Sequence, residues 1–459
     1  MTGSPHIPYY EPVDCETRNK RKTKDSVKGL FRLLAMDTIS DNNLGPLKAG
    51  QTVAIIGGGP AGSSCAIMLR RLASARGIPL RVVVFERKDF GVEQNICVGV
   101  LAPPFRRLLS SLDLVLPGDI IQRRIKGYTL HSKRRAVYLE GPSGNAEQTV
   151  AVNRSDLDAF LLRSVQEAGA TVFYDTVVDI VAEPGGVQVI TGEGARVPAD
   201  ALVGAFGLDT DTLSVFEARI PSFRRPGVTK SILTEIAVGE QTIDGRMDDT
   251  IHALLIDQLP GVEFGAVTPK REHVTVNIAG HDVTDVDLDA FLALSPVKKL
   301  VPEATLREPR HYTAFPSVPA QNFYDDRVVT IGNAAGLLRP LKGKGINTGI
   351  ITGIEAARTM IEVGISKRAF DEFYRQCGHL TSEFRYGSFL RWLYGLSNKL
   401  DSLDAVLALA AREPLLHRAF YEMVSGEGSY REIIWRSARP GLVTKIITAV
   451  ARQRILRRR

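Results

Sequence analysis

The 459-residue sequence has few cysteines, and their positions exclude several kinds of site. Its four cysteines, Cys15, Cys65, Cys97 and Cys377, form no C-x-x-C pair, which argues against a structural zinc site and a disulfide scaffold. The sequence also lacks H-x-x-H and H-E-x-x-H clusters, so we expect no metal centre. A reduced, cytoplasmic setting is therefore the expected one.

Long apolar runs are also missing. No stretch reaches the roughly 18 residues that a membrane-spanning helix needs, and the first 25 residues lack the apolar segment of a secretory signal. The hydrophobic fraction of 44% and the charged fraction of 24% are typical of globular proteins. The length is sufficient for two or three domains.

Positive charge is concentrated at the C-terminal end. The net charge is +7, and residues 436–459 carry eight basic residues and no acid. This pattern predicts either an amphipathic helix on an anionic membrane surface, and hence a peripheral location on its inner face, or a helix docked on the protein with a frayed basic end. The tail lacks interleaved aromatics, so we expect no nucleic-acid partner. The apolar residues on one face of this helix are Val443, Ile446, Ile447 and Val450.

A glycine-rich turn follows the first strongly apolar run of the chain. "IIGGGPAG" places Gly57, Gly59 and Gly62 in G-x-G-x-x-G spacing between a predicted strand and helix, and Glu86 ends the next strand. Gly57 would make the tight turn, Gly59 would let a pyrophosphate reach the backbone, and Gly62 would allow close helix–strand packing. Glu86 would accept hydrogen bonds from ribose hydroxyls. The pattern predicts a bound dinucleotide without separating FAD from NAD.

Residues 51 to about 435 resemble the geranylgeranyl reductase family of flavoproteins, which has the p-hydroxybenzoate hydroxylase fold. The matching segments are "GGGPAGSSCAIMLRR" with "FERK", "NRSDLDAFLL", "IGNAAGLLRPLKGKGI" and "LPGVEFGAVTPKREHVTVNIAG". The resemblance implies FAD as the cofactor. The residues that it implies as FAD contacts are Gly57, Gly59, Ala61, Gly62, Glu86, Arg87, Arg154, Gly332, Asn333, Pro340, Gly343, Gly345 and Ile346.

The sequence also departs from the family pattern. Asn333 replaces the acid expected after Gly332, and Phe206 stands where related hydroxylases have the acid of an Asp-Gly pair, which weakens a hydroxylase interpretation. In the segment that faces substrate in the family, Pro269 matches the expected residue. Three aromatic positions are replaced, which weakens the expectation of a long prenyl substrate; their residues here are Phe264, Ala266 and Thr268.

The predicted fold is α/β. A doubly wound, Rossmann-type FAD-binding domain (51–115, 145–210 and 311–365) would carry an inserted substrate domain of mixed or antiparallel sheet (116–144 and 211–310). An extension (1–50) would precede it, and a helical region (366–459) would end in the basic tail. Ser155 and Asp158 are predicted to cap the helix that begins near Arg154.

The expected reaction is reduction of a carbon–carbon double bond in a hydrophobic, lipid or isoprenoid-like substrate, with hydride from the flavin. The alternatives are an NAD(P)H-dependent flavin monooxygenase acting on an aromatic or polyketide-like substrate and an electron-carrier flavoprotein. No second G-x-G-x-x-G is present, so NADPH or NADH would bind transiently as the donor. A ferredoxin-like donor protein or a reduced quinone is equally compatible.

Three residues are candidates for a catalytic role. Cys97 aligns loosely with a family cysteine near the flavin, although a buried structural cysteine is the favoured interpretation. Lys342 and Lys344, beside the predicted helix start at Gly345, would add positive charge near the reduced ring unless they point into solvent. No residue stands out as the proton donor.

Overall fold

The computed structural model describes residues 44–95, 97–141, 147–183, 185–255, 259–302, 308–339 and 344–458. Most of the predicted N-terminal extension, residues 1–43, lies outside this part of the chain. The rest of the extension packs on the first domain. Leu47 is buried in its core, and the Leu47 N–H donates to the Met360 carbonyl at 3.0 Å.

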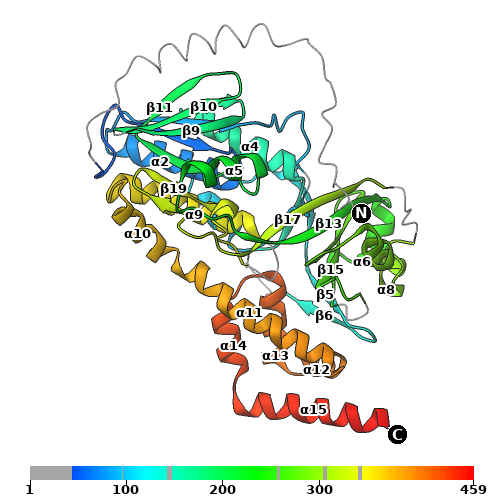
Figure 1. The fold of residues 1–459 in the computed structure, drawn as a ribbon. Coiled ribbons are helices and arrows are strands. Elements are labelled where there is room, and N and C mark those ends of the chain that lie inside the picture. Colours follow the sequence, from blue (N-terminus) through cyan, green and yellow to red (C-terminus); the bar gives the residue numbers. More distant parts are fainter. Residues whose placement is uncertain are drawn as a thin grey trace, which may run out of the picture.

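The first domain is built on a six-stranded sheet with the order β18-β19-β12-β1-β2-β8 (Figure 1). β1 pairs in parallel with β2 and β12, and β12 pairs in parallel with β19, so the chain returns to this sheet after the second domain. The apolar runs are buried because both faces of the sheet are covered. The strands are β1 (Thr52–Ile56), β2 (Arg81–Glu86), β8 (Thr171–Tyr174), β12 (Ala201–Gly204), β18 (Tyr324–Asp325) and β19 (Val328–Thr330).

Helices cover one face of this sheet, and α2 (Pro60–Ala75) and α9 (Gly345–Glu362) pack on each other there. Gly349 and Gly353 lie one turn apart on the face of α9 that meets α2. A Cβ at Gly353 would overlap the Ala61 carbonyl oxygen, so this approach depends on glycine. A third helix, α4 (Arg154–Glu167), packs beside α2.

Two small sheets complete the first domain. The sheet β11-β10-β9 lies against the other face of the main sheet, and the sheet β3-β7-β4 joins the domain to the rest of the chain. Helix α5 (Thr210–Arg219) adds Leu213 and Phe216 to the first core, which corrects the predicted start of the second substrate-domain segment at 211. The other elements are β3 (Val100–Leu101), α3 (Phe105–Ser110), η1 (Gly118–Ile120), β4 (Ile121–Arg124), β7 (Val150–Val152), β9 (Val177–Glu183), β10 (Gly186–Thr191), β11 (Arg196–Ala199) and η2 (Gly332–Ala334).

The second domain is a seven-stranded mixed sheet with the order β17-β13-β16-β15-β14-β5-β6. Only the β14–β5 ladder among the described pairings of this sheet is parallel. β17 pairs with β13, which corrects the predicted boundary at 311, because that boundary assigned β17 to the first domain. The elements are β5 (Gly127–His131), β6 (Ala136–Glu140), β13 (Gly227–Ala237), β14 (Thr250–Leu254), β15 (Phe264–Pro269), β16 (His273–Gly280), β17 (Arg310–Val318), α6 (Glu240–Met247), α7 (Asp285–Leu292) and α8 (Ser295–Leu300).

The remainder of the chain is helical, as predicted, and extends away from the first domain along α11 (Figure 1). Its core joins the second domain, because Leu407 and Tyr421 pack with Tyr128 of β5. The helices are α10 (Lys367–Gln376), α11 (Gly378–Lys399), α12 (Leu403–Ala410), α13 (Pro414–Ser425), α14 (Tyr430–Ser437) and α15 (Pro440–Arg458).

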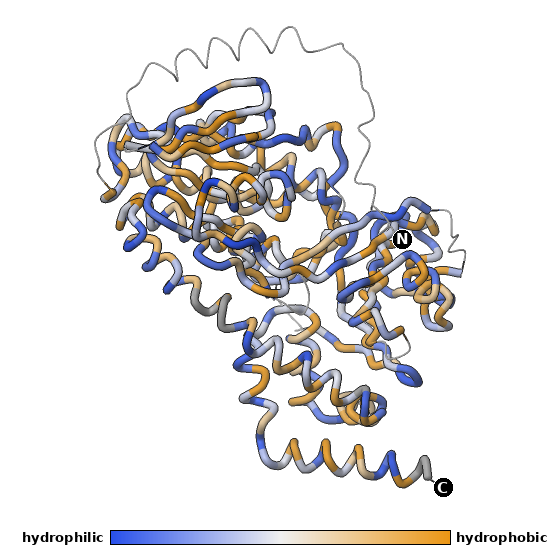
Figure 2. The backbone as a smooth tube through the Cα atoms, viewed as in Figure 1, coloured by the Kyte–Doolittle hydropathy of each residue, from blue (hydrophilic) through white to orange (hydrophobic). Residues whose placement is uncertain are grey.

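The basic tail forms α15, and its apolar residues face in two directions. Leu442 and Ile446 pack into a small core with α12 and α13, whereas Val443 and Ile447 are exposed. Hydrophobic and hydrophilic residues therefore alternate along the tube at this end of the molecule (Figure 2). Within the described ranges, no helix is long and apolar enough to cross a bilayer.

Candidate active site

The turn after β1 has the geometry that its glycines predict. Gly57 has a φ of 105°, and its N–H donates to the Phe85 carbonyl at 2.7 Å. A Cβ at Gly57 would lie 2.9 Å from the Phe206 Cα, and one at Gly62 would overlap the Gly57 carbonyl oxygen. Neither position can hold a side chain unless the backbone moves.

Gly59 differs from these two glycines, because a Cβ there would meet no protein atom within 4 Å. Gly59 is the N-cap of α2, and the first turn of this helix contains no acid. Free N–H groups and the helix dipole make such an end suitable for a phosphate. Ala61, two residues further along, faces α9 and Gly332 instead of open space.

Glu86 closes the same turn from the end of β2. Its carboxylate accepts hydrogen bonds from the N–H groups of Gly58 at 2.7 Å and Lys88 at 2.9 Å. The residue is 8% exposed, and burial raises the pKa of its carboxyl above the ordinary value. The neighbouring Arg87 is half-exposed and forms an ion pair with Asp209 at 3.2 Å, so its side chain is engaged outside the turn.

Arg154 begins α4 and is held by Asp158, one turn later. Its Nε donates to both oxygens of this buried carboxylate, at 2.9 and 3.0 Å, and Asn95 donates to the same group at 2.6 Å. Asp158 therefore orients Arg154 and does not cap the helix. The cap is Asn153, which corrects the predicted Ser155–Asp158 pair.

Cys97 and a lysine that the motif analysis missed lie near Arg154. Burial opposes the charge of Arg154, but the Asp158 carboxylate and the Cys97 side chain hold its pKa above the usual range. Cys97 is partly exposed, unlike Cys65. Lys270 is 2% exposed and donates to the Val152 carbonyl at 2.6 Å, and burial lowers its pKa. Its position directly after Pro269 in the family-like segment is the sequence signal that could have identified it.

The second glycine-rich segment starts at η2. Gly332 has a φ of 59°, and its N–H donates to Thr352 Oγ1 at 3.0 Å. A Cβ at Gly345 would lie 2.7 Å from Asn333 Oδ1, so the structure brings Asn333 to the first turn of α9. Ile346 is 9% exposed and packs in the first core. Three predicted residues, Pro340, Lys342 and Gly343, lie outside the described residues.

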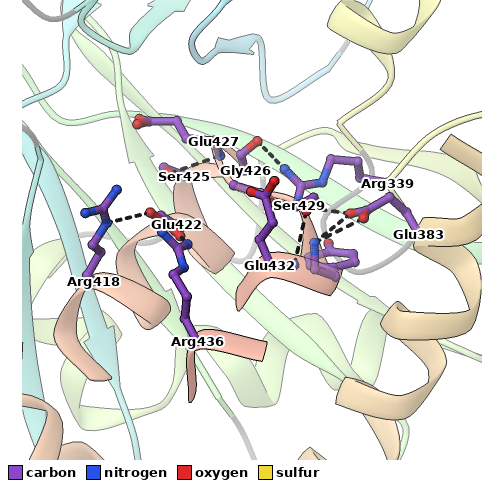
Figure 3. Close-up of polar contacts among 12 residues, drawn as sticks. Arg339, Glu383, Arg418, Glu422, Ser425, Gly426, Glu427, Ser429, Glu432 and Arg436 are labelled. Atoms are coloured by element: carbon purple, nitrogen blue, oxygen red, sulfur yellow. Dashed lines mark hydrogen bonds and ion pairs between the residues drawn. The ribbon is translucent and has the colours of Figure 1, made fainter. Parts of the chain in front are cut away.

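The described cations of this segment contact the helical region. Arg339 donates to the carbonyls of Gly426 and Gly428, forms a 3.4 Å ion pair with Glu383, and lies 4.4 Å from the ring centroid of Tyr430 (Figure 3). Lys344, the N-cap of α9, donates to the Ser425 carbonyl and lies 5.9 Å from the centroid of the Tyr128 ring. These cations hold the loop between α13 and α14.

An open cavity of about 850 Å³ lies beside the start of α9. One face of α9 lines it, opposite the loop after β3 and the helices α11 and α14. Sequence analysis missed this cavity, because its walls come from four separate parts of the chain. The lining residues used below are Pro103, Lys344, Ile351, Leu380, Glu427 and Trp435.

These features fit FAD. Gly59 leaves room at the N-terminus of α2, and Glu86 offers a carboxylate at the adjacent turn. Arg154 is held in place by Asp158 at the start of α4. Asn333 meets the start of α9, where backbone N–H groups are available to a flavin ring. The residues present can therefore hold a dinucleotide along α2 and present its ring at α9.

No family model matches the sequence. The chain is 24% identical to a geranylgeranyl diphosphate reductase from Synechocystis over 310 residues, which cover 64% of this chain and 71% of that protein. It is 22% identical to digeranylgeranylglycerophospholipid reductase 1 from Methanosphaera stadtmanae over 339 residues, which cover 72% of this chain and 80% of that protein.

A solved structure has the same fold. The geranylgeranyl bacteriochlorophyll reductase-like protein from Thermoplasma acidophilum matches with a TM-score of 0.68 and 18% identity, covering 87% of this chain and 99% of that one. The match confirms the predicted α/β fold with its helical C-terminal region. The sequence relatives confirm the predicted resemblance, and the chain is an oxidoreductase related to the geranylgeranyl reductase family of FAD-dependent enzymes.

Proposed function

We propose that this protein reduces a carbon–carbon double bond in a hydrophobic, isoprenoid-like substrate. The observation that carries the proposal is that the cavity adjoins the predicted flavin contacts. Lys344 is the N-cap residue of α9, next to those contacts, and it also lines the cavity. The relatives named above act, by their names, on geranylgeranyl compounds. FAD would supply the hydride when bound.

The residues of the chain have distinct tasks in this proposal. Gly59 and Glu86 bind the adenosine diphosphate part, and Arg154 and Asn333 contact the flavin half. Pro103, Ile351, Leu380 and Trp435 give the cavity an apolar lining suited to a hydrocarbon chain.

The departures from the family's aromatic pattern give the sheet a different surface. Phe264 packs near Phe315, with ring centroids 6.4 Å apart, while Ala266 and Thr268 are small. The proposed substrate is therefore isoprenoid-like, and its chain need not have the length of a geranylgeranyl chain.

The electron donor is proposed to be NADPH or NADH bound transiently, or a donor protein. The decisive experiment purifies the protein, records its absorbance spectrum and titrates it anaerobically with NADPH and NADH. Geranylgeranyl diphosphate is then added with and without dioxygen. Anaerobic reoxidation of the flavin by this substrate supports the reductase. Turnover that requires dioxygen supports a monooxygenase, and reduction of a quinone alone supports an electron carrier.

The two lysines remain a proposal of their own. Lys342 or Lys344 would favour the reduced ring by adding positive charge near it, and the Lys344→Met variant should then lower the flavin's midpoint potential with FAD still bound. An unchanged midpoint potential would mean that Lys344 serves to bind the Ser425 carbonyl and does not influence the flavin.

We also propose that α15 contacts a membrane surface from the cytoplasmic side. Val443 and Ile447 are exposed, and the helix carries basic residues without acids. Anionic liposomes should sediment the protein at low salt and release it at high salt, because screening weakens the attraction. Equal recovery in the supernatant with anionic and neutral liposomes would contradict this contact.

A further inference from the structure

Glu427 is an acid in the cavity wall that no motif identifies. It follows Gly426, whose φ of 78° ends α13 and turns the chain toward the cavity. Its Oε1 accepts a hydrogen bond from Tyr421 Oη at 2.7 Å, and its N–H donates to Ser425 Oγ at 3.3 Å. The side chain points away from the Arg339–Glu383 pair (Figure 3).

The charged groups and aromatic rings around Glu427 come from three elements. Lys344 approaches from the start of α9 and favours the carboxylate, whereas Glu422 on α13 disfavours it. Tyr421 stacks edge-to-face on Tyr128 of β5, with ring centroids 5.9 Å apart, which fixes the hydroxyl that reaches Glu427. Burial is the largest influence and raises the pKa of Glu427 above that of an exposed glutamate.

The other acids in the wall are less suited to proton donation. Glu383 is paired with Arg339 and accepts hydrogen bonds from the Tyr430 N–H at 3.0 and 3.1 Å, so its negative charge is compensated. Glu432 lies on the exposed side of α14. Glu427 combines partial burial, a hydroxyl partner and a position next to the N-cap of α9.

We propose that Glu427 is the acid that protonates one carbon of the double bond, and that Tyr421 positions its carboxyl. This inference rests on the proposed function. A hydride carries two electrons from the reduced flavin to one alkene carbon. The π electrons form a C–H bond at the other carbon as the Glu427 O–H bond breaks. The flavin is oxidised, the alkene is reduced, and the carboxylate regains a proton from water in the open cavity.

The first test separates the two half-reactions of the FAD-bound protein with geranylgeranyl diphosphate as the probe. Glu427→Gln keeps the size of the side chain and removes the acidic proton. We expect dithionite to reduce its flavin as in wild type, and reoxidation by the probe to slow by about 10²–10⁴-fold. Reoxidation at the wild-type rate would overturn the proposal.

A matched control lies at the other end of α13. Glu413 precedes this helix and pairs with Lys445 away from the cavity, so Glu413→Gln should reoxidise like wild type. Equal slowing in both variants would show a general effect on α13 and would also overturn the proposal. A wild-type protein that reduces no alkene overturns the proposed function as well, which distinguishes the two failures.

The pH profile tests the positioning role of Tyr421. The acid must be protonated, so reoxidation should slow as pH rises through the pKa of Glu427. Tyr421 lowers this pKa by its hydrogen bond, so Tyr421→Phe should move the alkaline limb to higher pH. If the alkaline limb of the pH–rate profile stays at the wild-type pH and the rate falls equally at every pH, Tyr421 has only a packing role. That result would overturn its proposed role in positioning Glu427.

Stability offers a readout without substrate. A raised pKa means that the folded protein holds the Glu427 proton more tightly, so the contribution of Glu427 to wild-type stability falls as pH rises above about 4.3 through the folded value. Glu427→Gln removes this loss. Its Tm relative to wild type should therefore increase between pH 4.5 and pH 8. A difference independent of pH would show an ordinary carboxyl and overturn the assignment.

Discussion

The two glycine-rich segments, at Gly57–Gly62 and at Gly332–Gly345, look alike in sequence but use glycine differently. In the first, Gly57 and Gly62 are surrounded by backbone and Gly59 faces open space, so one position is left for a ligand. In the second, Gly345 meets the Asn333 side chain, and the glycines that continue along α9 meet α2. Most of the described glycines there permit protein packing.

The segments also differ in charge. The first has a buried acid, Glu86, bonded to the turn itself. The second has Arg339 and Lys344, which bind carbonyl oxygens of a loop 81 to 89 residues further along the chain. A cation beside a cofactor motif can therefore serve the neighbouring chain, and its charge alone does not show that it faces the cofactor.

Removing the Arg339 charge should have the largest effect on stability. Arg339→Met leaves Glu383, which is 5% exposed, without its cation, and breaking a buried pair typically costs about 3–5 kcal/mol. The amides from Ser425 to Tyr430 should exchange hydrogen faster. Arg418→Met is the control. Arg418 is largely exposed, and its buried partner Glu422 keeps a second cation in Arg436, so the loss should be less than about 1 kcal/mol. Equal effects of the two variants would contradict the view that Arg339 holds the α13–α14 loop in place.

A valine in the first segment and a valine on the α9 face that follows the second segment should give opposite results. Gly353→Val forces α2 and α9 apart at the Ala61 carbonyl and should lower the free energy of unfolding by about 1–3 kcal/mol or more, measured by urea denaturation. The Cβ of Gly59→Val meets no protein atom within 4 Å, so the apoprotein should unfold near the wild-type midpoint. The side chain fills the space through which a pyrophosphate would reach the backbone, so the protein should purify without FAD. A yellow Gly59→Val protein would show that the cofactor does not approach this turn.

The smallest effect should come from Glu86. Its carboxyl has a raised pKa in the folded state, so the contribution of Glu86 to wild-type stability falls as pH rises through the window above about 4.3. In the apoprotein, Glu86→Gln should lose about 1 kcal/mol at low pH by weakening one amide contact and recover as pH rises. Its FAD affinity should fall at every pH, as measured by flavin fluorescence. An affinity equal to wild type would remove Glu86 from the ribose site.

The first turn could be predicted from the sequence because its contacts are local. Strand, turn, helix and acid lie within residues 52–86, and each residue type has one evident steric or electrostatic role there. The same applies to the strands of the second domain, whose β-branched runs predict them directly. The predicted resemblance rests on these segments too.

The tertiary structure decided the features that depend on distant partners. Asp158 could have capped α4, but the approach of Asn95 and the side chain of Arg154 made it an orienting group. β17 has no local signal for its sheet, because β13 supplies its hydrogen bonds. The cavity forms where α9, α11 and the α13–α14 loop meet, and this arrangement places Glu427 in its wall. Sequence patterns report local conformation, whereas burial, pairing and pKa depend on which residues the folded chain brings together.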